Sequence, residues 1–200
     1  MEFERVVLFG HSFVSHFVTF LSQNGPRTPS NFNLPKCKVT YLGESSRKVG
    51  QLCRSHLESI AAANPHLVFI MMGDNDLGSD CTASEVGHRL LSWVTTLKTM
   101  CVGAKVVICQ VFPRFTNPSH PYHSESYNEK AIELNSLLAQ ETGLHHDIYF
   151  LQFEFVVFHE AISEKFRAKK RFFVEKGIHL NPTGYFRLHR ELRQAIIALK

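Results

Sequence analysis

The stretch "VVLFGHS", residues 6–12, decides how this chain is expected to fold. It begins with four apolar residues, two of them β-branched, and continues with a glycine and two polar residues. A short unbroken apolar run of this kind is typical of a strand buried on both faces of a parallel sheet. The glycine and the polar pair predict a turn from that strand into a helix, with Ser12 at the turn.

Other apolar runs of strand length follow along the chain, and segments with helical periodicity separate them. The expected strands are 6–9, 67–71 ("LVFIM") and 106–111 ("VVICQV"), with two weaker candidates at 38–43 and 148–153. The expected helices are 49–63, 84–100, 127–142 and 184–199. Strands that alternate with helices predict an α/β fold: a three-layer α/β/α sandwich around a central parallel sheet, of flavodoxin-like type. We expect a single domain over residues 1–200, with a long surface loop at 113–126.

Composition limits the classes of protein to which the chain can belong. It is 44% hydrophobic and 20% charged, which is typical of a globular domain. No apolar run approaches the ~20 residues needed to cross a bilayer, and we expect no signal peptide. The five cysteines show no C-x-x-C spacing, so we expect neither a disulfide framework nor a metal site, and a reducing, cytoplasmic location. We expect no cofactor, and a net charge of +4 is too small to indicate nucleic-acid binding by itself.

Polar residues follow three of the expected strands directly. They are "GHS" at 10–12, "GESS" at 43–46 and "GDND" at 73–76. In an open parallel sheet the ligand crevice lies beyond the carboxyl ends of the strands. We therefore expect these three loops to meet at one edge of the sheet.

Three residues of the chain could carry hydrolytic chemistry. A nucleophilic serine needs an exposed hydroxyl, a base and N–H donors for an oxyanion; Ser12 fits this role, although alone it is more typical of a helix N-cap. The amide of Asn75 could donate to an oxyanion, or the residue could simply form a turn. His179 precedes the last expected helix and could act as a base, whereas a lone loop histidine is usually solvated.

In this order, G-x-S at 10–12, G-x-N-D at 73–76 and H-x-N-x-x-G-Y at 179–185 resemble the SGNH (GDSL-type) hydrolases over nearly the whole chain. The runs "VFPR", "YNEKAIELN" and "GIHLNPTGYFRLHRELRQAI" look similar to the esterase-type SGNH domains of animal retrotransposon first-frame proteins and their domesticated relatives. The resemblance implies Ser12 as nucleophile and His179 as base. It also implies Asn75 as an oxyanion donor, and at a strand-to-helix turn Ser12 can offer its own backbone N–H as another. No G-x-S-x-G elbow surrounds Ser12, which disfavours the ordinary α/β-hydrolases.

The chain departs from the SGNH pattern at three places. His11 replaces the usual Asp before the serine, and we expect little effect because this side chain is not the nucleophile. Ser46 stands where the family has its oxyanion-hole glycine, with Gly43 three residues earlier. The donor is a backbone N–H, so Ser46 can serve if it tolerates the required backbone angles. Lys176 stands at the Asp position of the D-x-x-H motif, with Glu175 beside it.

Lys176 bears directly on the expected activity. The triad carboxylate orients the histidine and stabilises its imidazolium, whereas a lysine there has the opposite charge and disfavours imidazolium. A backbone carbonyl or Glu175 could orient His179 instead. We therefore predict a weak or dyad-type serine esterase acting on acyl or acetyl esters or on a lipid. The alternative is a catalytically silent SGNH-like domain that binds nucleic acid, a membrane surface or a protein.

The binding alternative depends on the segment "EKFRAKKRFF", residues 164–173. Its basic residues are Lys165, Arg167, Lys169, Lys170 and Arg171. The phenylalanines between them could stack on bases or enter a membrane surface. The other interpretation is a solvated basic face over buried phenylalanines.

Overall fold

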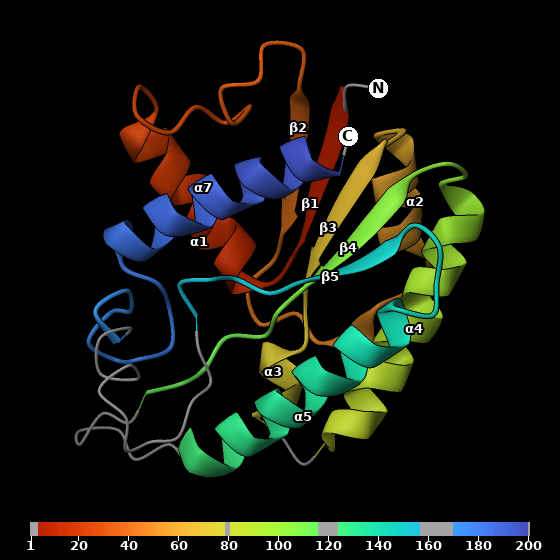
Figure 1. Ribbon diagram of the computed structural model, residues 1–200, viewed down its shortest axis with the longest axis vertical. Helices are drawn as coiled ribbons and strands as arrows, with labels where there is room; N and C mark the ends of the chain where they lie inside the picture. Colours follow the sequence, from red (N-terminus) through yellow and green to blue (C-terminus); the bar gives the residue numbers. More distant parts are fainter. Residues whose placement is uncertain (1–3, 79–80, 116–123, 157–169, 200) are drawn as a thin grey trace.

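The computed structural model describes residues 4–78, 81–115, 124–156 and 170–199, and these build a five-stranded parallel sheet (Figure 1). The strand order is β2-β1-β3-β4-β5, which is the flavodoxin-like order. The strands are β1 (Arg5–Gly10), β2 (Lys38–Gly43), β3 (Leu67–Met71), β4 (Lys105–Cys109) and β5 (Ile148–Leu151). The expected α/β fold with a central parallel sheet is confirmed.

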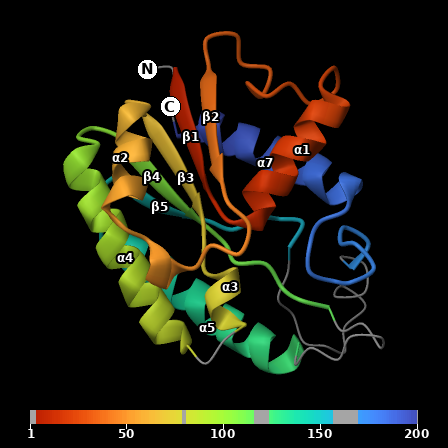
Figure 2. The same cartoon turned by 180° about the vertical axis from the view of Figure 1, so that it is seen from behind.

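Helices cover both faces of this sheet, as Figures 1 and 2 show from opposite sides. One face carries α1 (Ser12–Asn24) and α7 (Pro182–Ala198). The other carries α2 (Arg54–Ala62), α4 (Ala83–Met100) and α5 (Ser124–Thr142). Two short elements, the 3₁₀ turn η1 (Val49–Gln51) and α3 (Asp74–Leu77), lie in the loops after β2 and β3. Among the described helices, none is both long enough and apolar enough to cross a membrane.

The unbroken apolar runs form strands because each strand contributes side chains to two cores. On β1, Val6 and Leu8 join the core beneath α1 and α7, whereas Val7 and Phe9 join the core beneath α2, α4 and α5. Successive side chains of a strand point to opposite faces, so a strand covered on both sides must be apolar at every position.

The segment 49–63, expected as one helix, is divided into η1 and α2. Both carboxylate oxygens of Asp76 accept hydrogen bonds from the Val49 N–H, at 3.1 and 2.9 Å. Leu52 and Cys53 are extended between the two elements. A carboxylate 27 positions away therefore caps the first turn, and no local pattern indicates this.

Two asparagines of α5 hold the chain that leaves β4. Asn135 accepts from the Val111 N–H at 2.9 Å and donates to the Val111 carbonyl at 3.1 Å, so its amide replaces a strand partner. This explains why β4 ends at Cys109 rather than at Val111 as expected. Asn128, two helical turns earlier, holds both backbone groups of Arg114 in the same way, each at 2.9 Å.

Candidate active site

The carboxyl ends of β1, β2 and β3 meet around a cavity of about 450 Å³. It lies where the strand order changes direction, between β1 and β3, which is the usual ligand site of such a sheet. The lining residues come from the chain after β1, β2, β3 and β4, including residues of α1 and α3, from α5 and from the loop before α7: His11, Ser12, Phe13, His16, Ser45, Ser46, Asp74, Asn75, Phe112, Arg114, Tyr127, Ile178 and His179.

Ser12 is placed by a sharp transition from β1 to α1. A Cβ on Gly10 would lie 2.4 Å from the Met71 carbonyl oxygen, so only glycine lets β1 and β3 approach this closely at their ends. His11 is the N-cap residue and Ser12 the first residue of α1. The Ser12 N–H therefore belongs to the first helical turn, where N–H groups have no intrahelical acceptor.

His179 is carried by a short hairpin that precedes α7. Val174 donates its N–H to the His179 carbonyl at 2.8 Å, and the Gly177 N–H closes a tight turn onto the Val174 carbonyl at 2.8 Å. Gly177 has φ +71°, and a Cβ there would lie 2.3 Å from the Phe115 carbonyl oxygen. The Phe115 N–H in turn donates to Gly177. The hairpin is thus held against the chain that follows β4.

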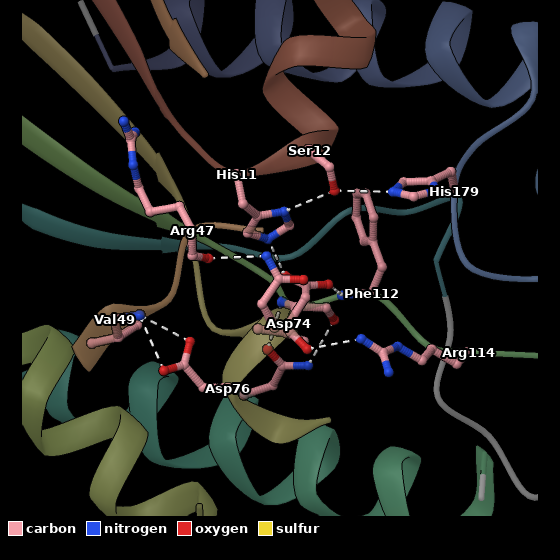
Figure 3. A network of polar contacts seen from close by, with 12 residues as sticks. His11, Ser12, Arg47, Val49, Asp74, Asp76, Phe112, Arg114 and His179 are labelled. Atoms are coloured by element: carbon pink, nitrogen blue, oxygen red, sulfur yellow. Dashed lines mark hydrogen bonds and ion pairs between the residues drawn. The ribbon is translucent and has the colours of Figure 1, made fainter. Parts of the chain in front are cut away.

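The Ser12 hydroxyl and the His179 ring are in direct contact, with 2.9 Å between Oγ and Nε2 (Figure 3). Within the described ranges this is the one hydrogen bond of the His179 side chain. Burial, followed by the neighbouring His16 and His11, lowers the pKa of His179 to about 4, against the opposing effect of Asp74. The His16 and His179 ring centroids are 4.4 Å apart. His179 is therefore neutral at pH 7 and can accept a proton.

The residues expected to form an oxyanion hole are partly brought together. Ser46 lines the cavity and adopts φ +63°, in the left-handed region that favours glycine. Asn75 also lines the cavity, and its Nδ2 donates to the Arg47 carbonyl at 2.9 Å, which leaves its second N–H for a ligand. Gly43 does not line the cavity. A Cβ there would lie 2.6 Å from the Ser15 nitrogen, so its role is close packing of β2 against α1.

Arg47 fixes the loop that presents Ser46, although the sequence analysis did not single it out. Its Nη1 donates to the carbonyl oxygens of Gly10 at 3.1 Å and Leu42 at 3.2 Å, at the ends of β1 and β2. Its Nη2 lies 2.6 Å from the Glu44 carboxylate. The sequence does not predict these contacts, because they require β1 and β2 to end side by side.

His11 and Asp74 form a second feature that sequence reasoning missed. The His11 side chain is buried and its Nε2 lies 2.6 Å from Oδ2 of Asp74, while its Nδ1 lies 3.5 Å from the Ser12 hydroxyl (Figure 3). Asp74 is also held through Oδ1, which accepts from the Phe112 N–H at 3.3 Å and the Tyr127 hydroxyl at 3.4 Å. The replacement of the usual Asp at position 11 therefore has a structural consequence that the sequence analysis did not expect.

Glu175 and Lys176 are the two central residues of the tight turn closed by Gly177. Both side chains are exposed, and neither lines the cavity. A turn places its central side chains toward solvent, so the unusual lysine is accommodated without burial of its charge. The role of Glu175 as an orienting carboxylate stays a prediction.

The basic segment is only partly described. Lys165, Arg167 and Lys169 lie outside the described residues. Lys170 and Arg171 are exposed, and the Arg171 guanidinium lies 4.8 Å from the centroid of the Phe172 ring. Phe172 and Phe173 are buried, so these two rings are core residues rather than stacking platforms. Within the described part of the chain, no group of three His, Cys, Asp or Glu side chains is placed to hold a metal ion.

Comparison with known proteins agrees with this fold. Similar solved structures include a GDSL-like lipase from Bacteroides thetaiotaomicron, with 20% identity, a TM-score of 0.72 and coverage of 98% of this chain and 89% of that chain. A lipase/acylhydrolase from Enterococcus faecalis has 17% identity and a TM-score of 0.66, with coverage of 98% of this chain and 95% of that chain. An acetylxylan esterase from Geobacillus stearothermophilus has 17% identity and a TM-score of 0.62, with coverage of 96% of this chain and 93% of that chain. At such identities the likeness shows the fold alone.

No curated protein matches the chain. The sequence pattern of the GDSL-like lipase/acylhydrolase family, however, matches residues 9–187, which run from the end of β1 into α7 and include every cavity-lining residue named above. The chain therefore belongs to the GDSL-like lipase/acylhydrolase family.

Proposed function

We propose that this protein is a serine esterase that hydrolyses small acyl or acetyl esters through Ser12 and His179. The observation that carries the proposal is the 2.9 Å contact between the Ser12 Oγ and the His179 Nε2. The two residues are 167 positions apart, and the contact lies in the cavity at the carboxyl edge of the sheet. A serine hydroxyl in contact with a neutral imidazole is the arrangement that nucleophilic acyl transfer requires.

In the proposed reaction His179 accepts the Ser12 proton while Oγ forms a bond to the ester carbonyl carbon. The carbonyl electron pair moves onto its oxygen. When the tetrahedral intermediate collapses, the bond to the alcohol breaks and His179 returns the proton to the departing oxygen. A water molecule then repeats the sequence on the acyl-enzyme.

The oxyanion is proposed to bind between the N–H groups of Ser12 and Ser46 and the amide of Asn75. These groups lie just beyond the carboxyl ends of β1, β2 and β3. Donors that are fixed before the charge develops lower the barrier most, because they need no reorganisation during the reaction.

The proposed esterase is a dyad rather than a triad, and this makes it weak. Within residues 4–78, 81–115, 124–156 and 170–199, no carboxylate hydrogen-bonds to His179. Burial, the largest contribution, lowers the pKa of His179 to about 4, so the ring is available as a base but holds the transferred proton poorly. Loss of the orienting carboxylate cost about 10⁴ in kcat in a serine protease.

A small substrate suits the cavity. Its volume of about 450 Å³ lies toward the lower end of the range for ligand pockets. Its walls combine aromatic rings, including Phe13 and Phe112, with the polar site residues. The acyl group remains a proposal, and we favour acetyl or another short chain.

The test uses p-nitrophenyl acetate turnover together with labelling by a fluorophosphonate, which bonds to activated serines. We expect slow turnover and labelling of the wild type, loss of both in Ser12→Ala, and a strong reduction in His179→Ala. Ser59→Ala removes an exposed serine hydroxyl on α2 that donates to the Ser55 carbonyl, and it is the matched control expected to retain both activities. Turnover that survives Ser12→Ala, or a wild type that is neither labelled nor active, would overturn the proposal.

The binding alternative has less support in the described residues. Lys170 and Arg171 are exposed and could contact a phosphate, but the neighbouring rings of Phe172 and Phe173 are buried. An inert wild type with strongly salt-dependent affinity for nucleic acid or anionic vesicles would favour it. The relationship to retrotransposon first-frame proteins stays a prediction.

A further inference from the structure

Two imidazole rings, not one, face the Ser12 hydroxyl. Figure 3 shows dashed lines from Ser12 to both His179 and His11. The distances from Oγ are 2.9 Å to Nε2 of His179 and 3.5 Å to Nδ1 of His11. His11 is only 1% exposed, so its ring occupies a fixed position beneath the nucleophile.

Of these two rings, His11 is the one that has a carboxylate partner. Its Nε2 lies 2.6 Å from Oδ2 of Asp74, a side chain that is itself buried. The remaining oxygen of Asp74 is occupied by the Phe112 N–H and the Tyr127 hydroxyl. The carboxylate therefore cannot turn away from His11 without losing these bonds.

The hydrogen bonds of Asp74 also determine which nitrogen of His11 carries the hydrogen. Burial alone would raise the pKa of Asp74, but the charge and hydrogen bond of His11, the Arg114 guanidinium and the Phe112 N–H outweigh it and lower the pKa. An ionised carboxylate only accepts hydrogen bonds, so Nε2 of His11 is the donor. In the neutral ring Nδ1 is then an acceptor, and it faces the Ser12 hydroxyl.

We propose that His11, oriented by Asp74, is a second proton acceptor for Ser12 and acts beside His179. This inference rests on the proposed role of Ser12 as the nucleophile. In a catalytic triad one histidine contacts both the serine and a carboxylate. Here His179 has the shorter contact with Ser12, whereas His11 has the contact with the Asp74 carboxylate. A contact of 3.5 Å is long, but catalytic hydrogen bonds in unliganded enzymes often tighten only when substrate binds.

The proposed step balances without a further reactant. The Ser12 O–H bond breaks and its proton goes to Nδ1 of His11, while Oγ bonds to the ester carbonyl carbon and the carbonyl electron pair moves to oxygen. Nε2 keeps its hydrogen, and the resulting imidazolium is stabilised by the adjacent Asp74 carboxylate. His11 also lines the cavity, so Nδ1 can return the proton to the departing alcohol oxygen, which is bonded to the same carbon.

The first experiment measures the rate at which a fluorophosphonate labels Ser12, which reports nucleophilicity whatever the natural substrate. In His11→Gln, the glutamine amide can still donate a hydrogen bond to Asp74 from near the position of the His11 Nε2. The substitution removes Nδ1, the proposed acceptor of the Ser12 proton. We expect His179→Ala to label about 10-fold or more above the Ser12→Ala background, and His179→Ala/His11→Gln to fall to that background. His88→Gln changes an exposed histidine of α4, bonded to Ser84, and is the matched control expected to label at the wild-type rate.

The second experiment tests Asp74 as a positioning residue. In protein with ¹⁵N-labelled histidine, we expect the neutral His11 ring to carry its hydrogen on Nε2. Asp74→Asn presents an amide that can donate to Nε2 and should move the hydrogen to Nδ1, which leaves no acceptor for Ser12. Labelling of His179→Ala/Asp74→Asn should then match that of His179→Ala/His11→Gln. If Asp74 acted only on stability, Asp74→Asn would lower the melting temperature. It would not also change both the tautomer of the His11 ring and the labelling rate.

Several results would overturn the inference. Equal labelling of His179→Ala and His179→Ala/His11→Gln would show that His11 accepts no proton, while Ser12-dependent turnover of the wild type would leave the esterase proposal intact. A hydrogen on Nδ1 of the wild-type ring would exclude the acceptor role directly. A wild type that is never labelled at Ser12 would remove both proposals together. If Asp74→Asn does not fold, the His11→Gln comparison decides alone.

Discussion

The pH dependence of kcat/KM offers a direct test of the site, because the base sits in an unusual environment. Burial, followed by the effects of His16 and His11, lowers the pKa of His179 to about 4. In the proposed mechanism the neutral ring is the active form, so activity should rise as the pH rises through about 4 and then remain constant. With this pKa, ~90% of the rings are neutral at pH 5, whereas an ordinary histidine of pKa ~6.5 would be only ~3% neutral. The two cases differ by about 30-fold in kcat/KM at pH 5, relative to the plateau near pH 8.

The assay is p-nitrophenyl acetate hydrolysis between pH 4 and pH 8, with circular dichroism at each pH to confirm that the fold persists. Replacing the neighbouring histidine in His16→Gln should move the midpoint to higher pH, because the charge of His16 opposes protonation of His179. A midpoint near 6.5 in the wild type would refute this reasoning. It would mean that His179 is more solvated than the structure shows, or that a carboxylate such as Glu175 reaches the ring in solution.

Three further substitutions test other parts of the site. Lys176→Asp restores the D-x-x-H carboxylate and should raise kcat about 10-fold and move the pH midpoint upward; an unchanged rate and midpoint would mean that the exposed turn keeps residue 176 in solvent. Asn75→Ala removes a proposed oxyanion donor and should lower kcat by about 10²–10³ with little change in KM, and a rate within twofold of the wild type would exclude that role. Asn181 caps α7 through the Gly184 N–H at 3.0 Å and donates to the Phe173 carbonyl at 3.1 Å. Asn181→Ala should therefore lower the free energy of unfolding by about 1–2 kcal/mol in urea, and an unchanged urea midpoint would contradict this.

The centre of the sheet could be predicted because β1, β3 and β4 are short, largely apolar and buried on both faces. Residues 38–43 were expected as a strand and form β2 with those bounds. The site could be predicted in outline because Ser12 and Asn75 directly follow strands that are parallel neighbours, and parallel strands end at the same edge. The structure places both residues and His179 around one cavity, whereas their chemical roles remain proposals.

What could not be predicted depends on contacts between distant side chains. The break between η1 and α2 requires Asp76 to reach Val49, and the end of β4 requires Asn135 to reach Val111. The His11–Asp74 pair joins the loop after β1 to the loop after β3. Local propensity contains no information on any of these contacts, because each arises only after the sheet has aligned the strand ends.

The two asparagines of α5 have a consequence for how this scaffold can be altered. Asn128 and Asn135 each hold both backbone groups of one residue in the chain after β4, at Arg114 and Val111. Four hydrogen bonds therefore fix the register between α5 and the sheet on the site side of Phe115. Arg114 lines the cavity, so α5 holds one wall of the site in place through Asn128. We therefore expect substitutions elsewhere in α5 that keep Asn128 and Asn135 to leave this wall of the cavity in place.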